Sequence, residues 1–418
     1  MALISKGIGI SSKKLFAITI LNAGPLAFYF AIAHFNFQNI FQNFSTQSTW
    51  VNLGSALFYF FAAISAFIGV FLSKRISGKK FLWAWTAFGV LVTGMLPFFK
   101  GEVFTLIFGA LFGVALGLGF PYSLSLLANC TRIEQRGRVS GILLLETFVL
   151  IAIGLFFTDA LNFGLIGTVI ILMALRATSF LGIATDEITS CTRPIGQMAT
   201  VSRVRKKETN KNFLLYFIPW ILFFIVIVLT DHIIWPTLET NPQINQILTT
   251  DPWHYVGTAV SGVISGFMAD RFGRKIPIVI GLSLLGFSLV LIASVVTPVS
   301  VFIHLMAIGI AFGFLMVVYI AIPGDLAEPN SGEMLYALIV VLPLAIYGGL
   351  GALPRIFGAS ATASALSWIL TSLIFLSIVP IYIAKDTLKE EKIQERQIKE
   401  YVKKVGELID DSKRTEKD

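Results

Sequence analysis

Long apolar stretches constrain this chain more than any other feature. About twelve of them follow one another, each near the 20 residues that span a bilayer as a helix. The first six cover residues 15–34, 50–72, 81–99, 103–128, 139–157 and 163–183. The second six cover residues 213–233, 253–269, 276–295, 299–322, 334–353 and 359–384. Only 13% of the residues are charged, about half of what a soluble chain carries. The sequence therefore predicts an all-α integral membrane protein.

The basic residues predict how the chain is oriented. If the N-terminus is cytoplasmic, 29 of the 32 Lys and Arg residues fall on the cytoplasmic side, as the positive-inside rule requires. Lys100 and Arg355 fall outside, and Arg176 lies within a span. We expect a multi-pass protein of the cell (plasma) membrane, surrounded by the lipid bilayer, with both termini cytoplasmic. The net charge of +8 then reflects topology, so no nucleic-acid partner is expected.

The two cysteines, Cys130 and Cys191, both fall on the expected cytoplasmic side. Because that compartment is reducing, we expect free thiols with no structural role. Two isolated cysteines do not make a metal site, and no other motif indicates a cofactor.

The chain repeats itself at half length. The glycine pair Gly113 and Gly117 recurs as Gly309 and Gly313, 196 residues later, and a charged hinge follows both the second and the eighth span. The repeat predicts two six-helix bundles, residues 1–183 and 213–384, joined by a cytoplasmic linker at 184–212. Residues 385–418 have apolar side chains at helical spacing, which predicts an amphipathic cytoplasmic tail.

The second hinge carries the most specific pattern, G-x-x-x-D-R-x-G-R-K. Its residues are Gly266, Asp270, Arg271, Gly273, Arg274 and Lys275. This pattern resembles the signature loop of the major facilitator superfamily (MFS) of secondary transporters. The resemblance implies the MFS fold: twelve transmembrane helices in two six-helix pseudo-repeat halves. It also implies that the loop is a latch, which clasps the cytoplasmic end of the opposite half.

The residue types of the hinge also indicate how it could act. Asp270 can accept hydrogen bonds from the exposed N–H groups of a facing helix start. Arg271, Arg274 and Lys275 would hold the loop in the anionic cytoplasmic interface. A basic membrane anchor with no latch is the alternative.

The loop after the fourth span is the expected partner of the latch. Arg136, Gly137 and Arg138 follow Glu134 there, which resembles the acidic-then-RG(R) loop of many superfamily members. We expect Arg136 and Arg138 to pair with Asp270 when the cytoplasmic side is closed. The corresponding loop after the tenth span is acidic, with Asp325 as an inter-half partner. Solvated loop charge is the alternative interpretation.

The first hinge departs from the pattern. Ser73 occupies the position of Asp270, and Glu333 occupies the position of Arg138 in the other loop. The sequence therefore does not extend the latch to this hinge.

The resemblance implies that the first, fourth, seventh and tenth helices line a central cavity. Their larger polar and aromatic side chains make up the candidate substrate site, namely Asn22, Tyr29, Tyr122, Tyr216, Trp220 and Tyr319. These residue types predict an aromatic, nearly uncharged cavity for a small hydrophobic or weakly polar organic solute. Aromatic residues that face lipid or pack the bundle are the alternative. Asp231 and His232, near the outer end of the seventh span, are expected at a solvated turn, with a role in an outer gate as the alternative.

Two charged residues lie deep within expected spans. Glu146 and Arg176 are each seven residues from the cytoplasmic end of their helix, so their depths match. They either form a structural ion pair, or Glu146 binds a proton that is coupled to transport, or the two lie apart.

Together these features predict a monomeric secondary active transporter that moves a small-molecule substrate by rocker-switch alternating access, with protons as a candidate coupling ion. No spacing of nucleophiles, acids and bases indicates an enzyme, so no catalytic residues are predicted. A non-transporting membrane sensor with the same fold is the alternative.

Overall fold

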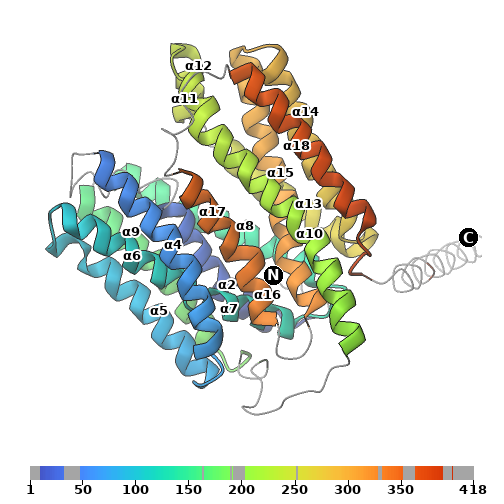
Figure 1. Ribbon diagram of the computed structural model, residues 1–418. Coiled ribbons are helices and arrows are strands. Elements are labelled where there is room, and N and C mark those ends of the chain that lie inside the picture. The colour runs from blue at the N-terminus through green and yellow to red at the C-terminus, as the bar shows by residue number, and fades with distance from the viewer. Residues whose placement is uncertain are drawn as a thin grey trace, which may run out of the picture.

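The computed structural model describes residues 10–32, 48–161, 164–188, 191, 203–250, 253–327, 332–351, 363–388 and 398. Within these residues every regular element is a helix (Figure 1). Nine of the described helices are long and apolar enough to cross a membrane. Each of the twelve expected spans coincides with a described helix or helix series, which agrees with an all-α membrane fold. Twelve as the number of spans stays a prediction.

Among the described residues, the first half of the chain holds seven α-helices and one short 3-10 turn. These are α2 (Ser12–Phe30), α4 (Ser48–Leu72), α5 (Gly78–Met95), η2 (Leu96–Phe98), α6 (Glu102–Gly117), α7 (Phe120–Cys130), α8 (Arg136–Leu161) and α9 (Gly164–Ile183). The fourth expected span is thus two helices, α6 and α7.

The second half holds the remaining α-helices and two π-helical turns. These are α10 (Arg203–Leu229), η4 (Thr230–Ile234), α11 (Trp235–Leu238), α12 (Pro242–Thr250), α13 (Trp253–Phe272), α14 (Lys275–Ser294), α15 (Pro298–Leu326), α16 (Gly332–Tyr336), η5 (Ala337–Val341), α17 (Leu342–Gly351) and α18 (Ala363–Ile383). The sequence did not predict α12, which lies between the seventh and eighth expected spans.

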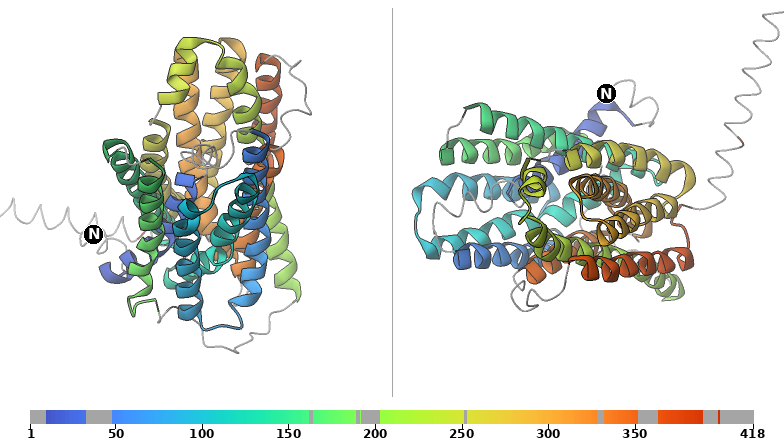
Figure 2. Two further views of the ribbon diagram at one scale, coloured as in Figure 1. Left: turned by 90° about the vertical axis from the view of Figure 1, so that its left-hand side faces the viewer. Right: turned by 90° about the horizontal axis from the view of Figure 1, so that it is seen from above.

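The helices form two groups that follow the order of the chain. Helices before residue 190 lie in one group and those after residue 202 in the other, and α8 packs against α13 where the groups meet (Figures 1 and 2). The domain boundaries that the sequence predicts agree with this division but remain predictions. The predicted amphipathic tail, apart from residues 385–388 and 398, and linker residues 189–190 and 192–202 lie outside the described residues.

The glycine repeat has a counterpart in the packing of the two halves. A Cβ atom on Gly113 of α6 would lie 2.3 Å from the carbonyl oxygen of Phe58, and one on Gly309 of α15 would lie 2.1 Å from that of His254. The two contacts are related by the same offset of 196 residues. The glycines therefore let α6 lie directly on α4, and α15 directly on α13, as small residues do between membrane helices.

The two halves differ where α6 breaks into α7, because α15 runs on unbroken at the matching place. The break leaves the carbonyl of Ala115 outside the regular helix ladder. Two buried side chains bond it instead: the indole N–H of Trp85 donates to it at 2.7 Å, and Nη2 of Arg176 at 3.2 Å. Arg176 also lies 4.0 Å from the Trp85 ring, so both side chains support the break.

Candidate functional site

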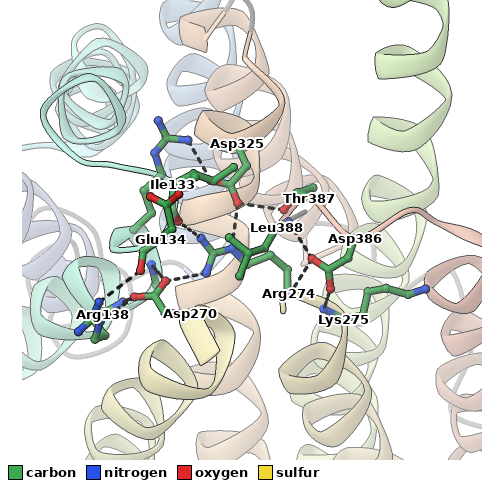
Figure 3. Close-up of polar contacts among 12 residues, drawn as sticks. Ile133, Glu134, Arg138, Asp270, Arg274, Lys275, Asp325, Asp386, Thr387 and Leu388 are labelled. Carbon is green, nitrogen blue, oxygen red and sulfur yellow. Dashed lines mark hydrogen bonds and ion pairs between the residues drawn. The ribbon is translucent and has the colours of Figure 1, made fainter. Parts of the chain in front are cut away.

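Asp270 joins the two halves at one end of the bundle. It lies near the end of α13 and is 2% exposed. Its carboxylate accepts hydrogen bonds from the backbone N–H of Gly137 at 2.8 Å and of Arg138 at 3.0 Å, and from Nε of Arg138 at 3.0 Å (Figure 3). The first N–H groups of a helix have no partner within it, so Asp270 caps α8 from the opposite half.

Arg274 sits behind Asp270 and is fully buried. Its Nη1 donates to Asp270 at 2.8 Å, and its Nε donates to Asp325 at 2.9 Å. Nη1 of Arg136, in the other half, also reaches Asp325, at 2.9 Å. Burial disfavours the charge of Arg274, but the carboxylates of Asp325 and Asp270 more than offset it and raise the pKa of Arg274 above its usual value. We call Arg136, Arg138, Asp270, Arg274 and Asp325 the charge network.

Two sequence expectations about these residues are wrong. Arg136 pairs with Asp325 rather than with Asp270, because Arg138 and Arg274 already bond the Asp270 carboxylate. Arg274 is inside the network rather than in the membrane interface. Of the hinge cations, Arg271 is the exposed one, with its guanidinium 5.5 Å from the Phe272 ring.

The segment after α18 adds a second cap at the same end of the bundle. The Asp386 carboxylate accepts from the backbone N–H of Arg274 at 3.1 Å and of Lys275 at 3.3 Å, at the start of α14. Gly273 allows this approach: its φ is +99°, and a Cβ there would lie 2.3 Å from Asp386. Thr387 then donates to Asp325 at 2.9 Å, which ties the segment to the charge network.

The first hinge also contacts the opposite half. The hydroxyl of Ser73 donates to a carboxylate oxygen of Glu333, at the start of α16, at 2.9 Å. This bond occupies the place in the repeat that Asp270 and Arg138 occupy in the other copy. Each hinge therefore contacts a helix start of the other half. In the Asp270 contact the acid is on the hinge, whereas in the Ser73 contact the acid is on the helix start.

A cavity lies between the two halves. About 150 Å³ of it is open to the centre of a water molecule. Its described lining includes residues of α2, α6, α7 and α8 from the first half and of α10, α13, α15 and α17 from the second. Eight of these residues are aromatic: Tyr29, Phe30, Phe120, Phe148, Trp220, Phe224, Tyr255 and Phe312.

The two π-helical turns both border this cavity. Asp231 of η4 and Val340 of η5 are lining residues. The carbonyl of Ile339, also in η5, accepts the indole N–H of Trp220, whose ring stacks on Tyr319 at 4.3 Å between centroids. The turn thus fixes an aromatic wall of the cavity, in keeping with the frequent use of π-helical turns at functional sites.

Comparison with known proteins identifies this arrangement. Neither a protein-family model nor a curated protein sequence matches the chain. The structure matches that of the MFS proton:xylose symporter XylE bound to 6-bromo-6-deoxy-D-glucose, with a TM-score of 0.64 and 16% identity, over 90% of this chain and 97% of that one. The chain has the major facilitator superfamily fold. It is a multi-pass membrane protein, in agreement with the nine apolar helices.

Within the MFS fold, the six predicted cavity residues have different surroundings. Tyr29 and Trp220 line the cavity. Tyr319 lies behind Trp220, and its hydroxyl donates to the carbonyl of Tyr216 at 2.8 Å. The Tyr216 hydroxyl donates to the carbonyl of Lys385 at 3.1 Å, near the charge network.

Asn22 and Tyr122 also lie away from the cavity lining. The Asn22 amide donates to the carbonyls of Ile18 at 2.9 Å and Ser123 at 3.3 Å, so it joins α2 to α7. The Tyr122 ring packs edge-on against Phe81, 5.7 Å away. These four residues are absent from the lining because they bond or pack between helices.

The structure does not pair Glu146 with Arg176. Arg176 points to α5 and α6, where it contacts Trp85 and the Ala115 carbonyl. Glu146 lies on α8 with its two carboxylate oxygens buried, and the side chain of Thr19 of α2 is close enough to hydrogen-bond with it. Equal depth and opposite charge did not predict contact, because the two side chains leave their helices in different directions.

The expectation for the cysteines is also corrected. Cys130, at the end of α7, and Cys191 form a disulfide that closes a loop of 61 residues. It joins the end of α7 to the start of the linker, so it does not cross between the halves.

Sequence reasoning missed the cavity carboxylate. Asp231, expected at a solvated turn, lines the cavity. A signal was present: Trp220, Phe224, Ile227 and Asp231 recur at spacings of four, three and four, which places them on one helix face. His254, at the start of α13, also lines the cavity and was not singled out.

Proposed function

We propose that the chain is a secondary transporter, which carries a small organic solute across the membrane by rocking of its two halves around the central cavity. One observation carries the proposal: a cavity lined by both halves coexists with a charge network that closes one end of the bundle between them. Breaking the bonds of Asp270 to α8 and of Arg136 to Asp325 would let that end separate. A single chain forms the whole cavity, which supports action as a monomer.

The basic-residue bias supports a cytoplasmic location for the charge network and for both termini. With this end closed, the cavity is in the outward-facing phase of the cycle. The hinge of residues 266–275 then acts as the latch of that phase. Its opening gives access to the cytoplasm.

The cavity lining favours a hydrophobic or weakly polar solute. Its eight aromatic side chains offer apolar surface, and its described polar groups are few. A sugar, by contrast, needs several amide and carboxylate partners for its hydroxyls. The fold shared with XylE does not decide the substrate, because one fold serves many functions.

Glu146 is the proposed proton-binding group. Its carboxylate oxygens are buried within a helix that can span the membrane, where an ionisable group is costly and marks a functional site. The separation from Arg176 supports this role over a structural ion pair. A proton gradient is therefore the proposed driving force.

The test combines binding with flux. A thermal-shift screen of the purified chain against small organic solutes identifies ligands, because binding to the folded state raises its stability. Each hit is then offered to sealed proteoliposomes with and without a pH gradient. We expect the solute to enter only proteoliposomes that contain the protein. We also expect Asp270→Asn to reduce this entry. Ligands that stabilise the protein yet never cross would reject transport and favour a membrane sensor.

A further inference from the structure

The cavity carries one carboxylate within an otherwise aromatic and apolar lining. Asp231 is the one acidic residue of the described lining, and no Lys or Arg accompanies it there. His254 is the other ionisable side chain besides the tyrosines. The formal charge of the described lining is therefore −1 when His254 is neutral, which favours a positive ligand over a negative one.

The position of Asp231 makes it part of the binding surface. It continues the face of α10 that presents Trp220, Phe224 and Ile227 to the cavity, and it lies in the π-helical turn η4. Tyr29 and Phe30 of α2, in the other half, line the same cavity. The carboxylate thus lies near the boundary between the halves.

Aromatic rings from both halves line the same cavity as this carboxylate and pack against one another. Phe30 of α2 lies 5.4 Å from Phe148 of α8 and 5.9 Å from Phe312 of α15, between ring centroids. Phe148 lies 5.9 Å from Tyr255 of α13. Aromatic faces attract organic cations, and cages of such rings recognise quaternary ammonium groups.

We propose that the cavity binds an organic monocation with an apolar or aromatic body, with Asp231 as its counter-charge. This substrate class rests on the proposed function and refines it. The rings hold the body of the ligand and its diffuse positive charge, and Asp231 selects the charge. A neutral solute of the same shape gains the apolar contacts but no attraction to Asp231, and an anion is repelled by it.

Three probes of similar shape separate these contributions. Benzyltrimethylammonium is a permanent cation, neopentylbenzene is its neutral carbon isostere, and benzylsulfonate is an anion. Binding to the full-length purified chain is measured by calorimetry and by melting temperature. We expect the cation to bind about tenfold or more tightly than the isostere, and the anion not to bind. Asp231→Asn should weaken binding of the cation more than binding of neopentylbenzene, and so reduce the preference for the cation.

A matched control removes a carboxylate outside the cavity. Glu239, exposed beyond α11, is replaced by Gln, and the ranking of the probes should stay as in the wild type. The wild-type ranking decides the question even where Asp231→Asn does not fold. Equal affinity for the cation and its isostere, or no binding of the cation, overturns the proposed substrate class and leaves transport of a neutral solute open. If the cation binds in a way that depends on Asp231 but does not cross the membrane of proteoliposomes, the proposed binding site is upheld and the proposed transport function is rejected.

Discussion

Ser73 donates a hydrogen bond to Glu333 at 2.9 Å, across the two halves, where the repeat places Asp270 against Arg138 in the other copy. The two contacts are alike in position but not in chemistry. In one copy a carboxylate on the hinge meets a cation on the helix start. In the other a hydroxyl on the hinge meets a carboxylate. The second hinge therefore lies beside the ion pairs of Asp270 and Asp325 between the halves, whereas the first hinge contributes a neutral donor.

Asp270→Asn should open the network end. The change keeps the size of the side chain but leaves Arg138 without its carboxylate and buried Arg274 with only Asp325. Removing one partner of a buried ion pair costs about 3–5 kcal/mol, here in the closed state only. Spin labels at exposed positions Arg75 and Ile276 should show longer distances across that end. Asp186→Asn is the control, because the Asp186 carboxylate is fully exposed and its removal should leave the distances unchanged.

Ser73→Asp should also open this end, although it restores the residue of the signature pattern. The new carboxylate would face Glu333, and two like charges 4 Å apart near a protein surface repel by about 4 kcal/mol. Glu333→Gln in the same chain should restore the closed distances. Closure that is unaffected by Ser73→Asp would show that the Ser73 contact does not hold the halves together.

Gly137→Ala should weaken the contact between α8 and α13. The added Cβ would lie 2.6 Å from Asp270 Oδ1 and from the carbonyl oxygen of Gly266, closer than atoms can approach. We expect a lower melting temperature and longer spin-label distances. Gly349→Ala provides the control, because its Cβ meets nothing within 4 Å, and alanine in a helix stabilises by about 0.5–1 kcal/mol.

Glu146→Gln and Arg176→Gln should act independently. Glu146→Gln should leave the melting temperature close to wild type and abolish uptake driven by a pH gradient. Arg176→Gln should lower the melting temperature, because Ala115 loses one of its donors. The change in the free energy of unfolding of the double variant should equal the sum of the two single changes within about 0.5 kcal/mol, as expected for separate sites. A double variant that recovers stability would indicate a pair.

The disulfide should be detectable in the purified protein. Iodoacetamide should modify neither Cys130 nor Cys191 until a reductant is added, as read by mass spectrometry. Cys130→Ser should lower the free energy of unfolding by about 2–4 kcal/mol, because the closed loop restricts the unfolded chain. Labelling of both thiols without reductant would contradict the bond.

The apolar stretches and the glycine repeat predicted the fold, because bilayer thickness and close helix packing act on residues near in sequence. The pattern around Asp270 likewise led to its place against Gly137. Partners of buried charges were harder to predict. Asp325 takes Arg136 because Arg274 occupies the space beside Asp270, and that crowding is visible only in three dimensions.

The cavity residues were likewise predicted only in part from the sequence. Tyr29 and Trp220 were predicted from their helices, whereas Tyr216 and Tyr319 turned away because their hydroxyls found backbone carbonyls. Asp231 was overlooked because nearness to a helix end was given more weight than its helical spacing from Trp220. Rotation about the helix axis, rather than depth, decided which side chains border the cavity.

The break between α6 and α7 has a mechanical consequence. Because Trp85 and Arg176 both donate to the Ala115 carbonyl, straightening this helix would leave the Trp85 indole without its acceptor in the bundle interior. In the proposed transport cycle we therefore expect the break between α6 and α7 to keep its shape. If the chain transports as proposed, we expect bending in the second half, where α10 and α16 lead into π-helical turns and no arginine bonds the turn among the described residues.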